Sequence, residues 1–264
     1  MIETRMRLAF PATFTLGVLL NSNAQLTSAE PIQFQSGVTQ AAFIELYTSD
    51  GCSSCPPAED WLSRLRGNPK LWKDFVPVAF HVDYWDHLGW KDAFSSRAWS
   101  ERQSDYATQW HNDTVYTPGF VLSGNEWRDW SNGVALPRPA LKPVGVLTAR
   151  SENSMRWSLR FHAAPGVTLS SCDFHIALLG FDLVSDVTAG ENRGRSLRHD
   201  FVVIALSNAA SSRSGEILQG VLSLSGRTDV SPKRLAIAAW VTPSKTLRPL
   251  QALGGWLPSA DRVP

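Results

Sequence analysis

Residues 41–65 read AAFIELYTSDGCSSCPPAEDWLSRL and contain the pattern on which the fold prediction depends. The stretch 41–48 is largely apolar and rich in β-branched and aromatic side chains, which predicts a buried strand that ends in a Ser-Asp-Gly turn. Residues 56–65 predict a helix, because proline is tolerated in a first turn whose N–H groups have no intrahelical partner. Cys52 and Cys55 lie between these elements, so the order is strand, CxxC, helix.

Further strands and helices alternate up to the middle of the chain. Residues 75–83 predict a second buried strand and residues 119–123 a third. Between them, residues 95–110 predict a helix with aromatic residues at helical spacing and with Ser95 or Ser96 as its N-cap. This alternation is typical of an α/β unit with a partly parallel sheet. We therefore expect an α/β domain, a mixed sheet flanked by helices, over residues 30–135.

The second half of the chain shows a different pattern. Three prolines close to Leu136 mark a linker. Beyond it, apolar and polar residues alternate with period two, and no long helical pattern occurs. We expect a separate, mostly antiparallel β-sandwich-like domain over residues 136–264. Its strand candidates are residues 155–162, 174–179, 201–206, 217–224 and 235–241.

The first 29 residues resemble an export signal more than a part of the fold. A basic start at Arg5 and Arg7 precedes a mostly apolar stretch over residues 8–20. Small residues then offer cleavage sites at Ser22-Asn23-Ala24 and at Thr27-Ser28-Ala29. This layout predicts a secretory signal peptide over residues 1–29, with an uncleaved membrane anchor as the alternative. We expect a periplasmic or secreted protein with no stable membrane insertion after cleavage.

Composition narrows the function. The 264 residues carry a formal net charge of +1, which gives no reason to expect a nucleic-acid partner. The chain has three cysteines, too few for a disulfide-stapled exported scaffold. A bridge between Cys52 and Cys55 would close a very small loop and stabilise the fold only weakly. The pair therefore indicates a chemical role more than a structural cross-link. Cys172 is expected to be a buried, inert thiol.

The place of the CxxC pair suggests a thiol–disulfide oxidoreductase. The N–H groups and the dipole at a helix N-terminus favour a Cys52 thiolate, which is the nucleophile of disulfide exchange. Cys55, one turn further on, would resolve the mixed disulfide. Ser53 and Ser54 either donate hydrogen bonds to the thiolate or simply form the turn. No flavin or nicotinamide motif occurs. We expect no cofactor beyond the redox-active disulfide, and as partners exported protein thiols or disulfides and an electron-donor or acceptor protein.

Two resemblances add to this reading. The strand, Cys52-Ser53-Ser54-Cys55 and the helix resemble the thioredoxin superfamily. Thr117-Pro118 resembles that superfamily's cis-proline element, which implies a cis bond and a peptide-binding role for these two residues. Four stretches also resemble an exported bacterial family catalogued as domain of unknown function 1223, which implies a thioredoxin-like fold and export but no substrate. These stretches are residues 45–58, 80–86, 115–118 and 190–199.

Three more side chains are candidate site residues. Glu45 lies near the place where thioredoxins keep a buried acid, which implies a proton relay; the alternative is a polar residue satisfied by the backbone. Tyr84 and Trp85 are expected to line a groove that binds substrate, with core packing as the alternative.

Other functions stay open at this point. Soft thiolates select Cu(I) and zinc, so a copper chaperone or a metal-site thiol protein could use Cys52 and Cys55. A permanently oxidised pair would make the chain a non-catalytic thioredoxin-like binding protein.

Histidines and acids elsewhere in the chain receive no metal assignment. His81, Asp83, Asp86 and His87 could hold a metal, but a polar strand end and loop is the preferred interpretation, so we assign no metal site. The basic stretch 193–199, which includes His199, either holds an anion or a carboxylate or forms a solvated loop.

Overall fold

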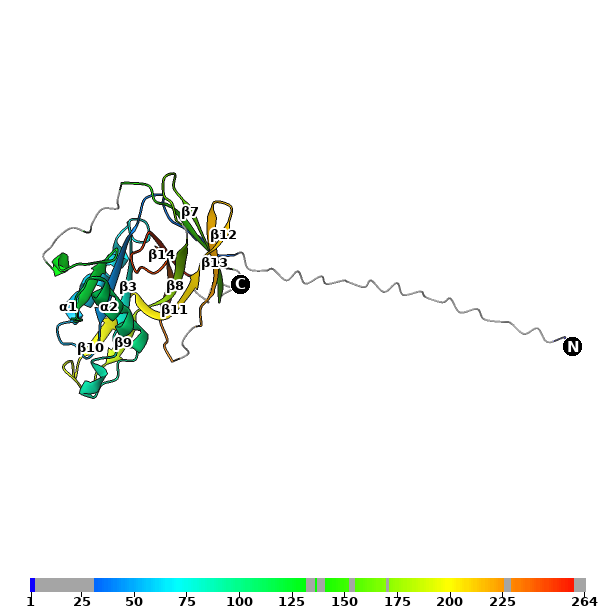
Figure 1. Cartoon of the computed structure of the whole chain (residues 1–264). Helices are drawn as coiled ribbons and strands as arrows, with labels where there is room; N and C mark the ends of the chain where they lie inside the picture. The colour runs from blue at the N-terminus through cyan, green and yellow to red at the C-terminus, as the bar shows by residue number, and fades with distance from the viewer. Residues whose placement is uncertain are drawn as a thin grey trace. The chain divides into compact units, whose positions relative to one another are not determined.

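Two parallel strands, β2 (Ala42–Thr48) and β3 (Phe75–His81), lie in the middle of the largest sheet (Figure 1). All seven residues of each strand are buried. A strand that is apolar on both faces must be covered on both, which explains why its sequence is a continuous apolar run and not an alternation. The first strand, the helix after CxxC, the second strand and the third strand all form where the sequence predicts them.

The computed structural model describes residues 1–2, 31–131, 136, 141–151, 155–169, 171–225 and 229–258. In these residues it has two α-helices, α1 (Pro56–Arg64) and α2 (Arg97–Gln109), and the side chain of Ser96 accepts a hydrogen bond from Ala98 N as the predicted N-cap of α2. The other strands are β1 (Gln33–Gln35), β4 (Gly119–Leu122), β5 (Asn125–Glu126), β6 (Gly145–Ser151), β7 (Arg156–Ala163), β8 (Cys172–Phe181), β9 (Leu183–Asp186), β10 (Ser196–His199), β11 (Val202–Ala210), β12 (Ser212–Ser214), β13 (Ile217–Ser223), β14 (Arg234–Pro243) and β15 (Gln251–Trp256). Three short 3₁₀ turns cover Leu65–Gly67, Asp86–Leu88 and Asp129–Ser131.

The expected fold class is wrong: the described structure is mostly β and is not a thioredoxin-like α/β domain followed by a β-sandwich. Its main sheet has eight strands in the order β15-β14-β8-β11-β3-β2-β4-β5. The reason lies at β3, whose outer edge is bound by a strand from the second half of the chain. Val202 of β11 pairs with Ala79 of β3, and Ala79 N donates to Phe201 O at 2.8 Å. Antiparallel pairing of β11 with β8, and of β8 with β14, then extends the same sheet.

Strands from both sides of the expected boundary at residues 135/136 therefore belong to one sheet. Residues 31–264 form one compact unit. A second sheet, in the order β1-β6-β7-β13-β12, packs on the β8–β14–β15 part of the main sheet. Large apolar side chains from both sheets, such as Trp157, Phe161 and Phe174, fill the core between them. A sandwich-like packing thus exists, but one of its layers is the sheet that also contains β2 and β3.

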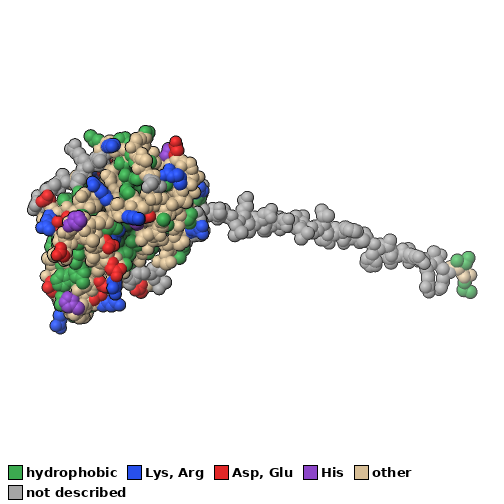
Figure 2. Space-filling model, in the orientation of Figure 1, with side chains coloured by type: hydrophobic (Ala, Val, Ile, Leu, Met, Phe, Trp, Pro, Cys, Tyr) green, Lys and Arg blue, Asp and Glu red, His purple; other side chains and the backbone are tan. Residues whose placement is uncertain are grey.

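Some expectations lie outside the described residues. The expected signal peptide lies outside them apart from Met1 and Ile2, and so does most of the expected linker near Leu136. Among the described residues, no helix has both the length and the apolar character that crossing a membrane requires. On the face shown in Figure 2, Lys and Arg side chains lie interspersed with Asp and Glu.

Candidate functional site

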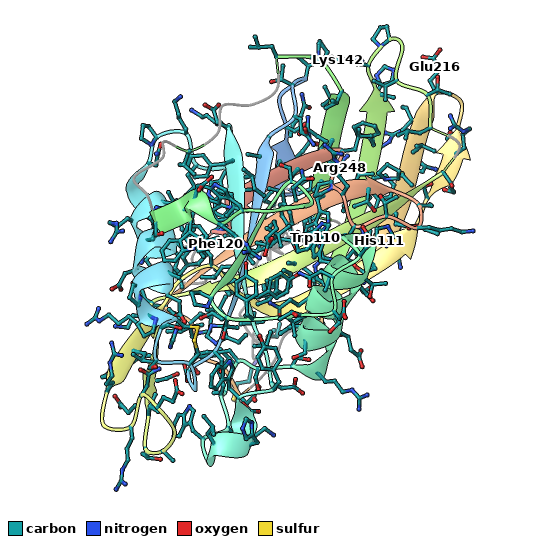
Figure 3. All side chains as sticks on the ribbon, turned by 60° about the vertical axis from the view of Figure 1, so that its left-hand side comes forward. Trp110, His111, Phe120, Lys142, Glu216 and Arg248 are labelled. Carbon is teal, nitrogen blue, oxygen red and sulfur yellow. A yellow bond between two sulfur atoms is a disulfide. The ribbon has the colours of Figure 1, made fainter. Side chains whose placement is uncertain are left out.

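The two cysteines form a disulfide at the start of α1. Cys52 and Cys55 are bonded, with their Cα atoms 5.4 Å apart (Figure 3, yellow bond). Cys55 is the N-cap residue of α1, and its backbone oxygen accepts from Ala58 N and Glu59 N at 2.9 and 3.2 Å. The pair thus lies at the positive end of a helix, where a thiolate is favoured over a thiol.

Ser53 and Ser54 have different partners. The hydroxyl oxygen of Ser54 lies 3.3 Å from Cys52 Sγ, within the range of a hydrogen bond to sulfur. Ser53 instead points to Glu191, and it donates from its backbone N at 2.9 Å and from its hydroxyl at 2.7 Å. Both hydrogen bonds lower the pKa of the exposed Glu191 carboxyl, and the bond from the Ser53 backbone has the larger effect.

A loop from the second half of the chain covers the disulfide. We call residues 190–195 the capping loop; it joins the antiparallel strands β9 and β10. Inside it, the side-chain amide of Asn192 donates to the backbone oxygens of Asp50 and Cys52 at 2.8 and 2.9 Å. Asn192 is fully buried, and the exposed fractions of Cys52 and Cys55 are 1% and 0%. The disulfide is thus closed off from solvent, and the capping loop is bonded to the backbone of the segment that carries it.

The predicted substrate-binding residues gather on one side of the CxxC segment. The Thr117–Pro118 peptide bond is cis, as the sequence predicts. The indole of Trp85 donates to Thr117 Oγ1 at 2.8 Å. The Trp85 backbone and Cβ also pack on Gly51, where an added Cβ would lie 2.7 Å from Trp85 Cβ. Trp85 therefore connects the residue before Cys52 to the cis-proline segment, and only glycine fits at position 51.

Pro118 opens onto an aromatic hollow of about 380 Å³. Its lining contains the side chains of Tyr116, Phe120, Trp127, Arg128 and Trp130. Tyr84 lies beside Trp85 and Thr117: its ring centroid is 6.4 Å from that of Trp85, and its hydroxyl hydrogen-bonds the Thr117 side chain and donates to Gln103 Oε1 at 3.2 Å. Both aromatic residues predicted to bind substrate thus lie next to Thr117, and Trp85 also contacts Gly51, the residue before Cys52.

Glu45 takes part in a separate buried network. Arg102 Nε donates to Glu45 Oε2 at 2.8 Å, and the hydroxyl of Tyr106 donates to Oε1 at 2.5 Å. Tyr47 adds a longer bond at 3.3 Å. Burial raises the pKa of Tyr106 well above its usual value, and the Glu45 charge is the next largest cause of this rise. Glu45 therefore accepts hydrogen bonds from two tyrosine hydroxyls and from the Arg102 guanidinium.

Next to the disulfide lies a second group of polar side chains that is almost wholly buried. We call Asp50, Glu59, His81, Asp92 and His199 the acid–histidine cluster; none is more than 6% exposed. Asp50 ends the segment before Cys52, and Glu59 lies in α1, four residues after Cys55. His81 ends β3, and His199 ends β10. The cluster thus lies where the ends of β2, β3 and β10 meet the first turns of α1.

Each histidine of the cluster faces carboxylates. His199 Nδ1 hydrogen-bonds Glu59 Oε2, and His199 Nε2 lies 3.2 Å from Asp50 Oδ1. His81 Nδ1 lies 2.7 Å from Asp92 Oδ2, which also accepts from Asp50 N at 2.9 Å. The two imidazole rings are 5.1 Å apart and nearly perpendicular.

The charges of the cluster shift one another's pKa values. Burial alone would lower the pKa of His199, but Glu59 and Asp50 raise it well above its usual value. Burial would likewise lower the pKa of His81, but Asp92 raises it. Burial would raise the pKa of Asp50, yet the bond and charge of His199 hold it at about 2. The directions of these shifts favour the charged forms of His199, His81 and Asp50.

The match to a protein family covers most of this site. A family model described as "Protein of unknown function (DUF1223)" matches residues 43–242. The chain belongs to this family. The matched range contains both cysteines, the capping loop and all five residues of the acid–histidine cluster. No curated protein matches the chain.

Two solved structures are similar to this DUF1223 chain. One is a crystal structure of an Agrobacterium tumefaciens protein, 19% identical, with a TM-score of 0.56; the similarity covers 84% of this chain and 96% of that one. The other is HBP35 of Porphyromonas gingivalis, 10% identical, also with a TM-score of 0.56, covering 84% of this chain and 76% of that one. At these identities the similarity concerns the fold alone.

Sequence reasoning missed the part of the site that closes around the disulfide. The four family-like stretches, although separate in the sequence, supply Ser54, Trp85, Thr117 and Asn192 to its surroundings. Of the residues that a metal site would have used, only His81 joins the cluster. Asp83 binds Ser100, Asp86 binds Ser95, and His87 is exposed. Two signals were available: the acids Asp50 and Glu59 on either side of CxxC, and the stretch 193–199 with its option of holding a carboxylate, whose His199 binds Glu59.

Proposed function

We propose that this DUF1223 protein is an exported thiol–disulfide oxidoreductase that acts on protein thiols or disulfides through Cys52 and Cys55. The observation that carries the proposal is the disulfide at the N-terminus of α1 with the Ser54 hydroxyl 3.3 Å from Cys52 Sγ. In the reduced protein both features stabilise a Cys52 thiolate, which is the species that exchanges disulfides.

The proposed reaction needs no cofactor. A substrate thiolate attacks Cys52 Sγ, the Cys52–Cys55 bond breaks, and Cys55 leaves as a thiolate that takes up a proton. The second substrate thiolate then attacks the substrate sulfur of the mixed disulfide and releases Cys52. The substrate dithiol loses two electrons and the pair gains them; the reverse sequence reduces a substrate disulfide. An exported electron-donor or acceptor protein resets the pair.

Substrate binding is proposed for the side of the CxxC segment that contains Trp85, Thr117 and Pro118. The aromatic hollow beside Pro118 offers apolar surface together with the Arg128 guanidinium, which suits an extended peptide segment. Ser53 becomes available to a substrate when Glu191 releases it. In this proposal, movement of the capping loop and substrate binding occur together.

One observation favours a second candidate function. Cys52 and Cys55 are both buried, and two side chains of the capping loop hold the segment between them. A bridge that stays closed would make the chain a non-catalytic binding protein. This reading and the first one differ in the ease with which the disulfide is reduced.

The reduction potential of the Cys52–Cys55 couple decides between the two. The purified protein is equilibrated with glutathione redox mixtures and its free thiols are counted, with Cys172→Ser to remove the third thiol. A potential near or above about −200 mV supports the oxidoreductase, and one below about −300 mV supports the closed bridge. Metal analysis of the reduced protein, compared with the oxidised protein, tests whether copper or zinc binds to the two thiols instead.

Export is proposed from the sequence of the first 29 residues and has its own test. The protein is expressed with its full N-terminus in a Gram-negative host, and the periplasmic fraction is analysed by intact mass. Cleavage after Ala24 or Ala29 supports a removed signal peptide. Full-length protein in the membrane fraction would support an anchor instead.

A further inference from the structure

His81 has an imidazole nitrogen for which the described residues provide no partner. Its Nδ1 lies 2.7 Å from Asp92 Oδ2, whereas Nε2 is buried and has no hydrogen-bond partner among the described residues. His81 as a whole is 1% exposed. A carboxylate that holds one imidazole nitrogen and leaves the other free is the usual second-shell arrangement of a metal-binding histidine. A buried imidazole nitrogen without a partner otherwise costs free energy.

Two other potential ligands lie beside His81. One ligand atom from each of Glu59, His81 and His199 can be chosen so that all three lie within 4.8 Å of one another. The same holds for Asp50, His81 and Asp92. Each of the first three residues comes from a different element, α1, β3 and β10, and each is buried. Three buried donors fixed by separate elements around one point make a preformed site.

We propose that Glu59, His81 and His199 bind a divalent transition-metal ion of the zinc class, with Asp92 orienting His81 and Asp50 supplying a further carboxylate. Two imidazoles and a carboxylate are a ligand set that zinc uses in proteins, and they bind first-row divalent ions in general. No sulfur takes part, so the site differs from a thiol–metal site at the cysteines. The inference also goes beyond disulfide exchange and stands or falls without it.

The charge balance of the cluster suits a dication. With both histidines neutral, the three carboxylates give the cluster a charge of −3, which a buried site does not tolerate without compensation. Two protons on the histidines or one divalent ion with neutral histidines each bring it to −1. The ion therefore replaces protons, and its binding releases them.

Glu59 is the residue of the proposed ligand set that borders a surface hollow. This residue lines a surface hollow of about 230 Å³ together with Pro56, Asp60, Arg195 and Leu197. Arg195 belongs to the capping loop, whose movement would widen the same hollow. In the proposal, the ion enters from this hollow at Glu59, on the α1 side of the cluster.

The test uses full-length oxidised protein, in which a thiol titration shows that Cys52 and Cys55 are bonded. The protein is stripped with a chelator and titrated with Zn²⁺ in competition with a chromophoric chelator, and proton release is followed with a pH indicator. Co²⁺ replaces zinc for visible spectroscopy. We expect one zinc per chain, about one to two protons released, and a Co²⁺ ligand-field band.

Variants identify the ligands. His81→Gln and Glu59→Gln should abolish the stoichiometric zinc, and Asp92→Asn should weaken it by about 10- to 100-fold, as loss of a second-shell carboxylate does. His111→Gln, at an exposed histidine, is the matched control and should bind as the wild type does.

Two results would overturn the site. The first is wild-type oxidised protein that takes up neither Zn²⁺ nor Co²⁺ at micromolar concentrations, a result that does not depend on whether any variant folds. The second is unchanged zinc affinity in a folded His81→Gln protein. Either result leaves the disulfide proposal intact, because exchange is measured on metal-free protein.

Discussion

The side-chain amide of Asn192 donates a hydrogen bond to the backbone oxygen of Cys52 at 2.9 Å, although the two residues are 140 positions apart in the sequence. The same amide binds the oxygen of Asp50 at 2.8 Å. Asn192 thereby connects the capping loop to the turn that precedes the disulfide, and both bonds must break before the loop can leave. The accessibility of the disulfide is thus coupled to one buried side chain.

Replacing Asn192 should therefore expose the disulfide. Asn192→Ala removes the side-chain donor to the buried Asp50 backbone oxygen and one of the two donors of the Cys52 oxygen, which keeps its bond from Cys55 N. An unsatisfied buried group costs about 1–3 kcal/mol. If this cost destabilises the state in which the capping loop lies against the CxxC segment, reduction of the disulfide by dithiothreitol should accelerate by about tenfold or more. The rate is measured by quenching with a thiol-reactive reagent and mass spectrometry.

Asn112→Ala is the matched control for this change. The Asn112 side chain also bonds the backbone, here as the acceptor from Thr114 N, but it lies in the loop after α2. Its reduction rate should equal that of the wild type. An unchanged rate in Asn192→Ala would show that the capping loop does not limit access.

The Glu191–Ser53 contact should make access to the disulfide depend on pH. Because the two bonds from Ser53 lower the pKa of Glu191 in the capped state, their contribution is present above the unfolded pKa of about 4.3 and is lost as the pH falls through the lower folded value. At pH 7, Glu191→Gln should be reduced several-fold faster than the wild type. Below about pH 3 the two rates should converge.

The ratio of the two rates at each pH removes the pH dependence of the reductant itself. Glu216→Gln, at an exposed glutamate in the loop before β13, supplies the control and should give a ratio of one throughout. A Glu191→Gln ratio that stays constant from pH 3 to pH 7 would contradict the role of the carboxylate.

Local elements could be predicted from the sequence because their signals lie within a few residues. The apolar run of β2, the prolines at the start of α1 and the period-two pattern of β7 each specify one element. The pairing of Val202 with Ala79 has no such signal, because an edge of β3 can be bound by any strand of suitable direction. This single non-local pairing joins strands of the two expected domains into one mixed sheet.

In the candidate site too, features with a local sequence signal could be predicted and contacts between distant residues could not. CxxC and the Thr117–Pro118 pair were visible as short motifs, and the structure has the disulfide and the cis bond. The Glu59–His199 bond joins residues 140 positions apart, and isolated acids and histidines have no spacing pattern. The sequence suggested Glu45, not Glu59, as the buried acid near the cysteines. Glu45 instead accepts a hydrogen bond from Arg102 of α2 in a separate network.

The Glu45–Arg102 pair should be a major determinant of stability. The side chains of Arg102 and Glu45 are 9% and 0% exposed. Arg102→Met leaves a buried carboxylate without its partner, which should lower the free energy of unfolding by about 3–5 kcal/mol in urea titrations. The exposed Arg97–Glu101 pair is the control, and Arg97→Met should cost about 0–1 kcal/mol.

The same network tests the proton-relay role predicted for Glu45. A relay requires that Glu45→Gln shift the pH profile of disulfide exchange. A structural ion pair requires a loss of stability with an unchanged profile, and the contacts of Glu45 favour this second outcome. Adding Arg102→Met to Glu45→Gln should then recover part of the stability, because no unpaired charge remains.

A trapping experiment should distinguish the roles of the two cysteines. In reduced Cys55→Ser, the Cys52 thiolate attacks a disulfide such as oxidised glutathione, forms a mixed disulfide and releases glutathione thiolate. Without Cys55 no internal thiol resolves this bond, so a stable adduct should accumulate to one per chain. Cys52→Ser should form far less adduct, because the thiol at Cys55 is fully buried and has lost the neighbour that exchanges first.

Cys172 provides the internal control for the trap. It is buried in β8, and burial raises the pKa of its thiol, so it should remain unmodified in every variant. Peptide mapping by mass spectrometry locates the glutathione. Combining Cys55→Ser with Asn192→Ala should speed adduct formation, because the capping loop then opens more readily. Adduct on Cys172, or equal rates for the Cys52→Ser and Cys55→Ser variants, would contradict Cys52 as the attacking residue.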